Sequence, residues 1–471
     1  MRHTKIIATV GPATGSDEAI RQLLEAGVDV FRLNFSHGNH DSHGAVIRRI
    51  RAAAAETGRC VAILQDLSGP KIRTGRLRGG QPLPLAAGDT LTIEVGDFEG
   101  EPGRVSTTYA DLPRAVRPGD SLLLDDGRIQ LRVQAVSDRA LQTVVVDGGA
   151  LGEHKGINAP GVLLPSVGMT PKDLDDLRFG VSAGVDLIAL SFVQGPDDLS
   201  RAREAARTAG APNMPLVAKL ERPEAITRVE EILHLADAVM VARGDLGLEL
   251  PLEQVPRVQK LVTRRARALG IPVIVATQVL ESMVEEPRPT RAEVSDVANA
   301  VDDGVDAIML AGETAMGRHP IRAVQMLDRI IRDAESIPPI GAVPLEETRM
   351  VASHGRAICE AAVTLAERGD VAAIVAVTRG GNTAHVLSAL RPRAPIYAVT
   401  DLAETSRRLT LSWGVLPVVA DLSGDVGEAA QRIGAELVGR GSIPAGSMVV
   451  LVSISSDLAR GPSNFLKLQR I

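Results

Sequence analysis

Short apolar runs recur along this 471-residue chain at a spacing that strongly limits its possible folds. Eight of them start 25, 31, 126, 29, 22, 34 and 35 residues apart. Apart from the one long gap, each interval has room for a strand, a helix and two turns, which is the repeat of a parallel βα unit. The runs are 5–10, 30–35, 61–65, 187–192, 216–220, 238–242, 272–276 and 307–310.

The segments between the runs carry helix signals. Residues 16–27 begin with a serine N-cap and two acidic residues and end at a glycine, and the helical segments 196–210 and 255–270 also end at a glycine. Eight such βα units with buried strands predict an α/β fold, a (β/α)8 TIM-type barrel. A doubly wound open sheet is the alternative. Glycine, valine and aspartate also recur together where a helix gives way to a strand, at 27–29, 184–186 and 304–306.

The 126-residue gap is too long for a loop in a compact domain, so it holds an inserted domain. Glycine and proline are frequent between 71 and 165, which predicts a small β-barrel domain. It leaves the main barrel after the third strand, at the face where barrel active sites lie, and is placed to act as a lid. Its expected strands are 90–95, 121–124, 129–136 and 141–146.

A proline-containing linker after residue 335 separates a third unit. Strand-like runs with helical segments between them predict a second α/β sheet there. The runs are 371–378, 395–400, 416–420 and 448–454. The predicted domains are therefore 1–70 with 166–335 for the barrel, 71–165 for the β lid and 345–471 for the C-terminal α/β domain.

Composition excludes several classes of protein. The net charge is −6, aromatic residues are 2% of the chain and no lysine or arginine run stands out, which argues against a nucleic-acid partner. No run reaches the roughly 18 apolar residues of a membrane-spanning helix. The first apolar run is too short for a signal peptide, so we expect a cytoplasmic protein with no membrane partner. Cys60 and Cys359 offer neither a disulfide framework nor metal-ligand spacing.

Charged side chains gather where the expected strands end. The run 216–220 contains Lys219 and is followed by Glu221, and alternation places both on one face. A structural ion pair would explain these two alone. Five other strand ends are also polar, which favours an active site on one barrel rim. Glu221 and Asp245 on adjacent strands suit Mg²⁺, and Arg32 with Lys219 suits a phosphorylated substrate.

Longer motifs extend over the whole chain and resemble the pyruvate kinase family. Residues 4–14 look like the family's opening. The match continues in order through the barrel motifs 31–38, 240–247, 276–283, 289–300 and 309–315. The resemblance implies transfer of the phosphoryl group of phosphoenolpyruvate to ADP, giving pyruvate and ATP, the last step of glycolysis.

The resemblance also implies roles for individual residues. Lys219 would neutralise charge on the transferring group and the enolate, and Arg32 would grip the phosphate. Glu221 and Asp245 would hold Mg²⁺ or Mn²⁺, with a second metal arriving with the nucleotide. These roles suit phosphoryl transfer, which needs positioning and charge neutralisation more than covalent help.

Further residues are implied for the two substrates. The backbone around Arg243 and Gly244, with Asp245 and the hydroxyl of Thr277, would hold the carboxylate end of phosphoenolpyruvate, and Thr277 would join the proton relay. The nucleotide would be bound by Arg73, Lys155, His37 and Asn34.

One position departs from many members of the family. They carry a glutamate where this chain has Lys71, and they need K⁺ near the phosphoryl site. The K⁺ ligands would be Asn34, Ser36, Asp66 and the carbonyl oxygen of Leu67. The ammonium of Lys71 is a fixed positive charge that can replace the ion electrostatically. We therefore expect an enzyme that does not require K⁺.

The C-terminal unit resembles the family's regulatory domain. Its strand-to-helix turn matches the effector phosphate loop by position, although a plain βα turn gives nearly the same pattern. The resemblance implies a phosphorylated small-molecule effector and a homotetramer. The loop consists of Thr378, Arg379, Gly380, Gly381, Asn382 and Thr383.

Two other function classes stay open from the sequence. A different Mg²⁺-dependent barrel acting on phosphoenolpyruvate or an oxoacid, such as a lyase, would not explain Arg73, Lys155 or the lid. A non-catalytic sensor would be expected to have lost Lys219, Glu221 or Asp245, and all three are present.

Overall fold

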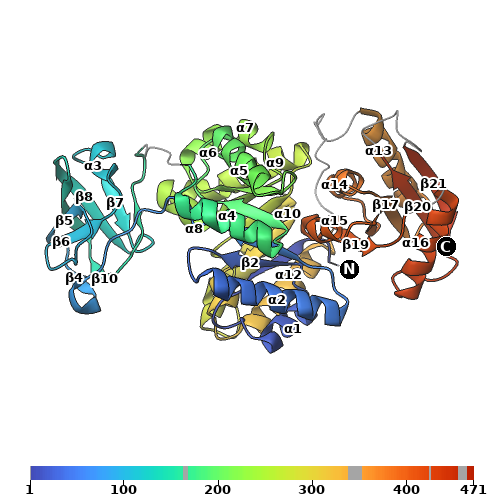
Figure 1. The fold of residues 1–471 in the computed structure, drawn as a ribbon, viewed down its shortest axis with the longest axis horizontal. Helices are drawn as coiled ribbons and strands as arrows, with labels where there is room; N and C mark the ends of the chain where they lie inside the picture. The colour runs from blue at the N-terminus through green and yellow to red at the C-terminus, as the bar shows by residue number, and fades with distance from the viewer. Residues whose placement is uncertain (1, 163–167, 338–352, 424–425, 455–463) are drawn as a thin grey trace.

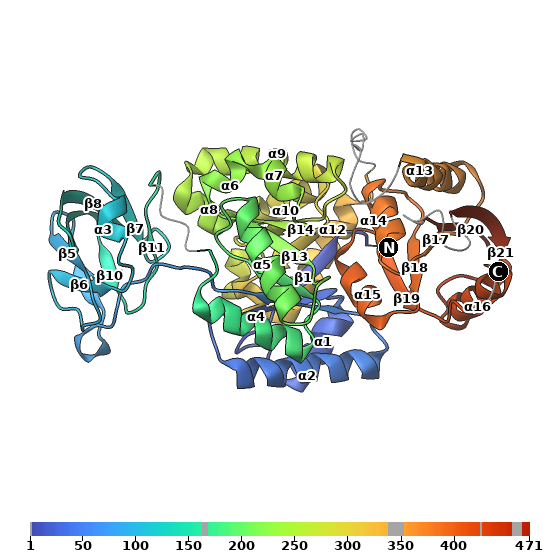
Figure 2. The same cartoon turned by 45° about the horizontal axis from the view of Figure 1, so that its top comes forward.

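The computed structural model describes residues 2–162, 168–337, 353–423, 426–454 and 464–471. Three bodies follow one another along the long axis of the molecule (Figure 1). The β lid lies at one end, the barrel lies in the middle and the C-terminal domain lies at the other end, and the turned view in Figure 2 shows the same order. The lid and the C-terminal domain therefore meet opposite faces of the barrel.

Eight parallel strands close the central barrel in the order β1-β16-β15-β14-β13-β12-β3-β2. This confirms the predicted barrel and excludes the open sheet. Three of the predicted runs, 216–220, 238–242 and 307–310, agree with their strands to the residue. The strands are β1 (Lys5–Thr9), β2 (Val30–Asn34), β3 (Ala62–Asp66), β12 (Leu187–Leu190), β13 (Leu216–Leu220), β14 (Ala238–Ala242), β15 (Val273–Ala276) and β16 (Ala307–Leu310).

Helices surround the barrel and begin and end where capping residues allow. In α4, Thr170 accepts a hydrogen bond from the backbone of Asp173 at the start, and Gly184 ends the helix at φ 77°. The barrel helices are α1 (Asp17–Ala26), α2 (His40–Thr57), α4 (Pro171–Ala183), α5 (Pro196–Thr208), α6 (Pro223–Thr227), α7 (Val229–Leu233), α8 (Arg243–Glu249), α9 (Val255–Ala268), α10 (Arg291–Asp303), α11 (Gly312–Ala315) and α12 (Pro320–Ala334).

The recurring glycine–valine–aspartate triplet has a physical explanation. Each glycine ends a helix in the left-handed region, where a side chain would be strained. Each aspartate then accepts a hydrogen bond from the backbone N–H of a neighbouring strand, which belongs to Ile6, Ile63 or Val273. The triplet therefore fastens the base of the barrel, far from the rim where the charged side chains gather.

The inserted domain is built from β strands around its own apolar core, as predicted. Six strands form one sheet in the order β11-β7-β8-β9-β5-β6, and β10 pairs with β4 in a second. It is a β half-barrel. Its elements are β4 (Leu83–Leu85), β5 (Thr90–Val95), β6 (Arg104–Thr107), α3 (Leu112–Ala115), β7 (Ser121–Leu124), β8 (Ile129–Val136), β9 (Ala140–Asp147), β10 (Gly149–Leu151) and β11 (Ile157–Asn158).

The C-terminal domain has a five-stranded sheet in the order β19-β18-β17-β20-β21. Four strands are parallel, as expected of an α/β sheet, and β21 adds an antiparallel edge that the sequence reading missed. The elements are α13 (Ser353–Arg368), β17 (Ala373–Val377), α14 (Asn382–Ala389), β18 (Ile396–Thr400), α15 (Ala403–Arg408), β19 (Val415–Val419), α16 (Val426–Gly439), β20 (Met448–Ser453) and β21 (Phe465–Arg470).

This domain is fastened to the base of the barrel. Leu411 is buried in the cluster that fills the barrel interior. The buried Lys5 ammonium donates to the carbonyl oxygen of Val415 at 2.7 Å, and Arg407 pairs with Asp186 at 2.7 Å. The predicted boundaries at 165/166 and 345 lie outside the described residues, so the boundaries stay predictions. No helix among the described residues has the length and apolar character needed to cross a membrane.

Candidate active site on the barrel rim

Lys219 is at the centre of the rim. It lies near the end of β13, and its side chain is 10% exposed. Its ammonium contacts Glu221 Oε1 at 2.8 Å, Asp66 Oδ1 at 3.1 Å and Ser191 Oγ at 2.7 Å. Burial alone would lower the pKa of Lys219, but the two carboxylates outweigh burial and raise it. Each of the three N–H groups of this ammonium has an oxygen partner.

Asp66 joins Lys219 to Arg32. Arg32 donates from Nε to Asp66 Oδ2 at 2.7 Å and from Nη1 to Thr9 Oγ1 at 3.2 Å. Burial would raise the pKa of Asp66, but Lys219 and Arg32 together lower it below the ordinary value. The structure therefore brings the two predicted phosphate-binding cations together around one buried carboxylate.

Glu221 and Asp245 fit a hard divalent cation. Burial and the neighbouring Asp245 raise the pKa of Glu221, while Lys219 opposes the rise. Two carboxylates that repel one another are the protein donors that Mg²⁺ commonly uses with water and substrate oxygens. Among the described residues, no cluster of three or more histidine, cysteine, aspartate or glutamate side chains could hold a metal. A resident metal at this rim would therefore depend on this pair.

The start of α8 and the loop after β15 are locked to one another. Thr277 has φ 66° and its hydroxyl accepts the N–H of Gly244 at 2.8 Å. The guanidinium of Arg243 donates to the carbonyl oxygen of Gln278 at 2.7 Å and pairs with Asp296 at 2.6 Å. The side chain of Arg243 is thus occupied in holding the loop, which leaves its backbone as the part available to a substrate, as the sequence reading implied.

The residues implied for K⁺ lie beside Asp66. Asn34 Oδ1 accepts the N–H of Ser36 at 3.1 Å, and the carbonyl oxygen of Leu67 accepts the hydroxyl of Ser191 at 2.8 Å. Lys71 lies at the base of the lid, where a methyl group at Gly156 would come within 3.1 Å of its Cε. Lys71 is half-buried, and its charge also acts on His37 in the loop after β2.

The residues implied for the nucleotide come from the lid and from the loop after β2. Arg73 donates to the carbonyl oxygen of His154 at 2.9 Å, and Lys155 pairs with Asp125 at 2.7 Å. Partial desolvation and the nearby cations Arg73, Lys71 and Arg32 lower the pKa of the exposed His37. Positive charge from the lid and from the barrel therefore meets at His37.

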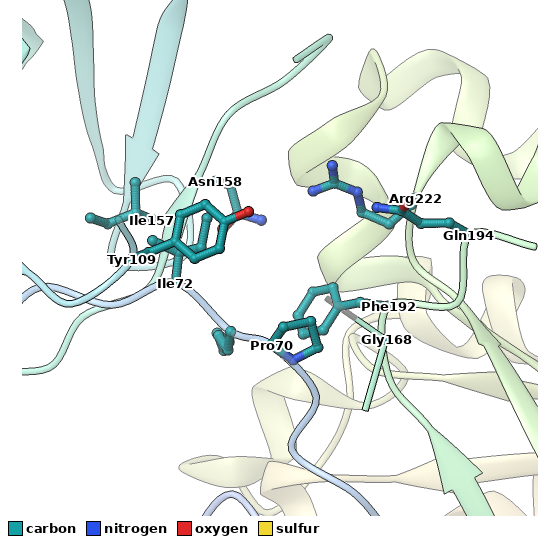
Figure 3. A pocket seen from close by; sticks show the side chains of 10 residues that line it. Pro70, Ile72, Tyr109, Ile157, Asn158, Gly168, Phe192, Gln194 and Arg222 are labelled. Carbon is teal, nitrogen blue, oxygen red and sulfur yellow. The ribbon is translucent and has the colours of Figure 1, made fainter. Parts of the chain in front are cut away.

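The cleft between lid and barrel opens beside this rim (Figure 3). Arg222 and Phe192 face it from the barrel, and Tyr109 and Asn158 face it from the lid. Its lining is completed by Pro70, Lys71, Ile72, Ile157, Gly168 and Gln194. Lys71 is thus also a cleft residue, at the point where the chain enters the lid.

Sequence reasoning missed Ser191 and Phe192, which follow β12. Ser191 binds Lys219, and Phe192, at φ 57°, donates its N–H to Glu221 Oε2 at 2.7 Å. The run 187–192 was interpreted only as an apolar strand. A hydroxyl at a barrel strand's end was the available signal.

The predicted effector loop is a turn between β17 and α14. Thr378 Oγ1 accepts the N–H of Gly381 at 2.9 Å, and Gly381 has φ 92° before the helix begins. Arg379 pairs with Asp401 at 2.9 Å on the surface. Thr383 is buried. This geometry agrees with a phosphate loop and with a plain βα turn alike.

A closed barrel that gathers cations and two carboxylates under a β lid defines an enzyme of the (β/α)8 class with an anionic substrate. The family model "Pyruvate kinase, barrel domain" matches residues 1–324, and "Pyruvate kinase, alpha/beta domain" matches residues 356–469. The chain belongs to the pyruvate kinase family. Its activity is the conversion of phosphoenolpyruvate and ADP to pyruvate and ATP.

Curated relatives extend over the whole chain. A pyruvate kinase of Mycobacterium intracellulare is 44% identical, covering 100% of this chain and 98% of the relative. One from Geobacillus stearothermophilus is 42% identical over 100% of this chain and 80% of the relative. Pyruvate kinase 2 of Synechocystis is 47% identical over 89% of this chain and 71% of the relative. The lyase and sensor alternatives are therefore set aside.

Proposed function

We propose that Lys219 is the residue that neutralises the transferring phosphoryl group and the enolate. The observation that carries this proposal is its buried ammonium, held between Asp66, Glu221 and Ser191 next to Arg32. Ser191 is the only uncharged partner of the three, so a phosphoryl oxygen would replace it at the least electrostatic cost. A preorganised cation at such a site stabilises developing charge without reorganisation.

Arg32 would hold the phosphate, and the backbone at Arg243 and Gly244 with Asp245 and Thr277 would hold the carboxylate. Thr277 would also be part of the proton path to the enolate carbon. Its hydroxyl now donates to the carbonyl oxygen of Ala276 and accepts from Gly244, so it can hold and pass a proton. Arg73, Lys155, His37 and Asn34 would bind ADP, which places the nucleotide between lid and rim.

Glu221 and Asp245 would hold Mg²⁺ or Mn²⁺. When bound, the divalent ion supplies charge neutralisation and orientation for the phosphoryl oxygens. The residues themselves contribute the hard oxygen donors, and Lys219 and the N–H of Phe192 fix the orientation of Glu221.

We further propose that K⁺ is not required. Lys71 provides an ammonium at the base of the lid, and after partial desolvation and Arg73 it is one of the causes that lower the pKa of His37. Initial rates would be compared with and without K⁺ at constant ionic strength. A loss of about a hundredfold without K⁺, the size expected when one electrostatic contact at the reacting group is removed, would overturn this part.

The turn at 378–383 would bind a phosphorylated effector, and the chain would act as a cytoplasmic homotetramer. Within the described part of the chain, no side chain caps the start of α14 and a Cβ at Gly380 would meet no atom within 4 Å, which leaves room for an anion beside this turn. Sedimentation velocity tests the tetramer. Isothermal titration with sugar phosphates and nucleotides, on wild type and Thr378→Ala, tests the loop.

One assay decides the central proposal. Pyruvate formation from phosphoenolpyruvate and ADP is followed with a coupled reaction for wild type and Lys219→Met. We expect a loss in the variant of about two to three orders of magnitude, the cost of one preorganised charge. Equal turnover of the two proteins would show that the site is assigned wrongly.

A further inference from the structure

Helix α8 (Arg243–Glu249) contacts the lid at two of its residues. Glu249 Oε1, at its last residue, accepts a hydrogen bond from Asn158 Nδ2 of the lid at 3.0 Å. The preceding Leu248 packs on a lid turn, where a methyl group at Gly127 would come within 2.9 Å of its Cδ2. Both contacts cross from one domain to the other.

Glu249 also contacts the segment of the barrel that follows Glu221. Arg222 Nη1 donates to Glu249 Oε1 at 3.3 Å, and Arg222 Nη2 donates to the carbonyl oxygen of Val162 at 3.4 Å. Arg222 directly follows Glu221 in the chain, and Figure 3 shows it facing Asn158 across the cleft. A single carboxylate thus links the residue after Glu221 to the lid.

The second metal-binding candidate is on the same helix. Asp245 precedes Glu249 by four residues, and positions four apart lie on one face of a helix about 6 Å apart along its axis. Each of the two proposed metal ligands is therefore joined to the Arg222–Glu249 pair through a short stretch of rigid backbone.

The three residues of this contact are buried, although two of them are charged. Arg222 is 5% exposed, Glu249 is 6% and Asn158 is 8%. Burial raises the pKa of Glu249 against the effect of Arg222, so the pair is held at a cost. A buried ion pair often contributes less stability than apolar packing of the same volume, and a specific arrangement is one reason to retain it.

The lid side of the contact leads to the nucleotide residues. The turn that carries Gly127 has positive φ at three successive residues, Asp125, Asp126 and Gly127. Asp125 in this turn holds Lys155 at 2.7 Å. A shift of α8 against the turn would therefore move Lys155 relative to the rim.

We propose that Arg222 and Glu249 are positioning residues. Through Asn158 they fix the position of the lid relative to the two carboxylates that are proposed to bind the metal. The pair does not touch the reacting atoms. The pair fixes the distance from Lys155 to the carboxylates of Glu221 and Asp245, so that the metal and the nucleotide phosphates are aligned when both are bound. This inference rests on the proposed roles of Glu221, Asp245 and Lys155.

The first test is Asn158→Ala, which releases the lid and leaves the ion pair intact. The KM for ADP is expected to rise about tenfold, because a hydrogen bond to a charged group is lost. Mn²⁺ affinity without substrates, measured by electron paramagnetic resonance, is expected to stay within about twofold of wild type. An unchanged KM for ADP would overturn the attachment of the lid through Asn158.

The second test is Glu249→Gln, which keeps an acceptor for Asn158 but leaves Glu224, 3.6 Å from Nε, as the carboxylate partner of Arg222. Mn²⁺ affinity is expected to fall at least about fivefold, since the positive charge of Arg222 next to Glu221 is then less fully neutralised and competes with the metal. Glu231→Gln, which breaks the exposed pair with Arg228, is the matched control and is expected to have no effect. Unchanged Mn²⁺ affinity in Glu249→Gln would overturn the coupling.

A double variant distinguishes a positioning role of the Arg222–Glu249 pair from a loss of folding. The double variant Asn158→Asp with Glu249→Gln keeps one amide, one carboxylate and one negative charge in the contact, and it is expected to recover most of the Mn²⁺ affinity that Glu249→Gln loses. Thermal unfolding identifies any variant that does not fold. If wild type binds Mn²⁺ and Glu221→Gln does not, the proposed metal site holds whatever Glu249→Gln does, so the two proposals can fail separately.

Discussion

The ammonium of Lys219 lies 3.1 Å from the carboxylate of Asp66, although the two residues come from strands that do not pair. Strand β12 lies between β13 and β3, and its following residue Ser191 fills the gap by binding Lys219. The barrel's interior at the rim is thus narrow enough for charges from three strands to form one network. Each proposed contact with phosphate depends on that network.

Replacement of Lys219 by methionine is expected to lower kcat while leaving metal binding in place. The side chain keeps its length but loses the charge, which corresponds to about 3–4 kcal/mol of barrier at a preorganised site. Steady-state kinetics gives the loss, and Mn²⁺ titration checks the metal. Lys219→Arg keeps the charge but changes its shape, so we expect activity between the two. Equal loss in both variants would point to packing instead of charge.

Asp66→Asn is expected to destabilise the fold at neutral pH by about 3 kcal/mol, because two buried cations lose their shared anion. The pKa of Asp66 is lowered in the folded state, so its contribution is present above the ordinary carboxyl pKa of about 3.9 and is lost as pH falls through the folded value. The free energies of unfolding of wild type and variant should converge in acid. Denaturant titrations at neutral pH and below pH 4 measure this, and a constant difference would contradict it.

Removal of the divalent metal should abolish activity reversibly. We expect Mn²⁺ binding to need both carboxylates, so Glu221→Gln and Asp245→Asn should each weaken it by at least about tenfold, the effect of losing one charged ligand of two. Glu253→Gln, on the surface after α8, is the control. Retained affinity in either variant would place the metal elsewhere.

Lys71→Glu is expected to create a requirement for K⁺. The substitution replaces the fixed cation by an anion, which would add a carboxylate to the oxygen ligands implied for a monovalent ion at Asn34, Ser36 and Asp66. Activity without K⁺ should fall by about two orders of magnitude and return when K⁺ is added. Lys71→Gln removes the charge without adding a ligand, so added K⁺ should restore its activity less than it restores that of Lys71→Glu. If Lys71→Glu is as active as wild type in Na⁺ alone, Lys71 has no part in charge balance at the site.

The barrel could be predicted well from the sequence because each of its strands is marked by residues that are neighbours in the chain. Each buried strand is a short apolar run, and triplets such as Gly184-Val185-Asp186 mark the turns between helix and strand. Lys219 and Glu221 were found for the same reason, since charge at the end of a buried run is visible in one dimension. The antiparallel strand β21 was missed because its residues alternate weakly and lie at an exposed edge.

The contacts that join distant segments could not be predicted. Asn158 and Glu249 are 91 positions apart, and neither stands out from its neighbours until the fold brings them together. Ser191 was overlooked because a serine after an apolar run is common in turns. Arg222 and Glu249 are likewise 27 positions apart, and their contact forms only in the folded chain.

Strand β1 closes the barrel by pairing with β16, so Lys5 lies opposite Ala307. As the chain is synthesised from its N-terminus, β1 leaves the ribosome about 300 residues before its partner exists. Until then the growing sheet has two open edges, which are templates for pairing with other chains. The lid, with all its strands between residues 83 and 158, can complete its own core in the meantime. In a cell, the period in which the open sheet edges can pair with other chains therefore lasts until the last barrel strand is made. Chaperone dependence should fall sharply once residue 310 has emerged.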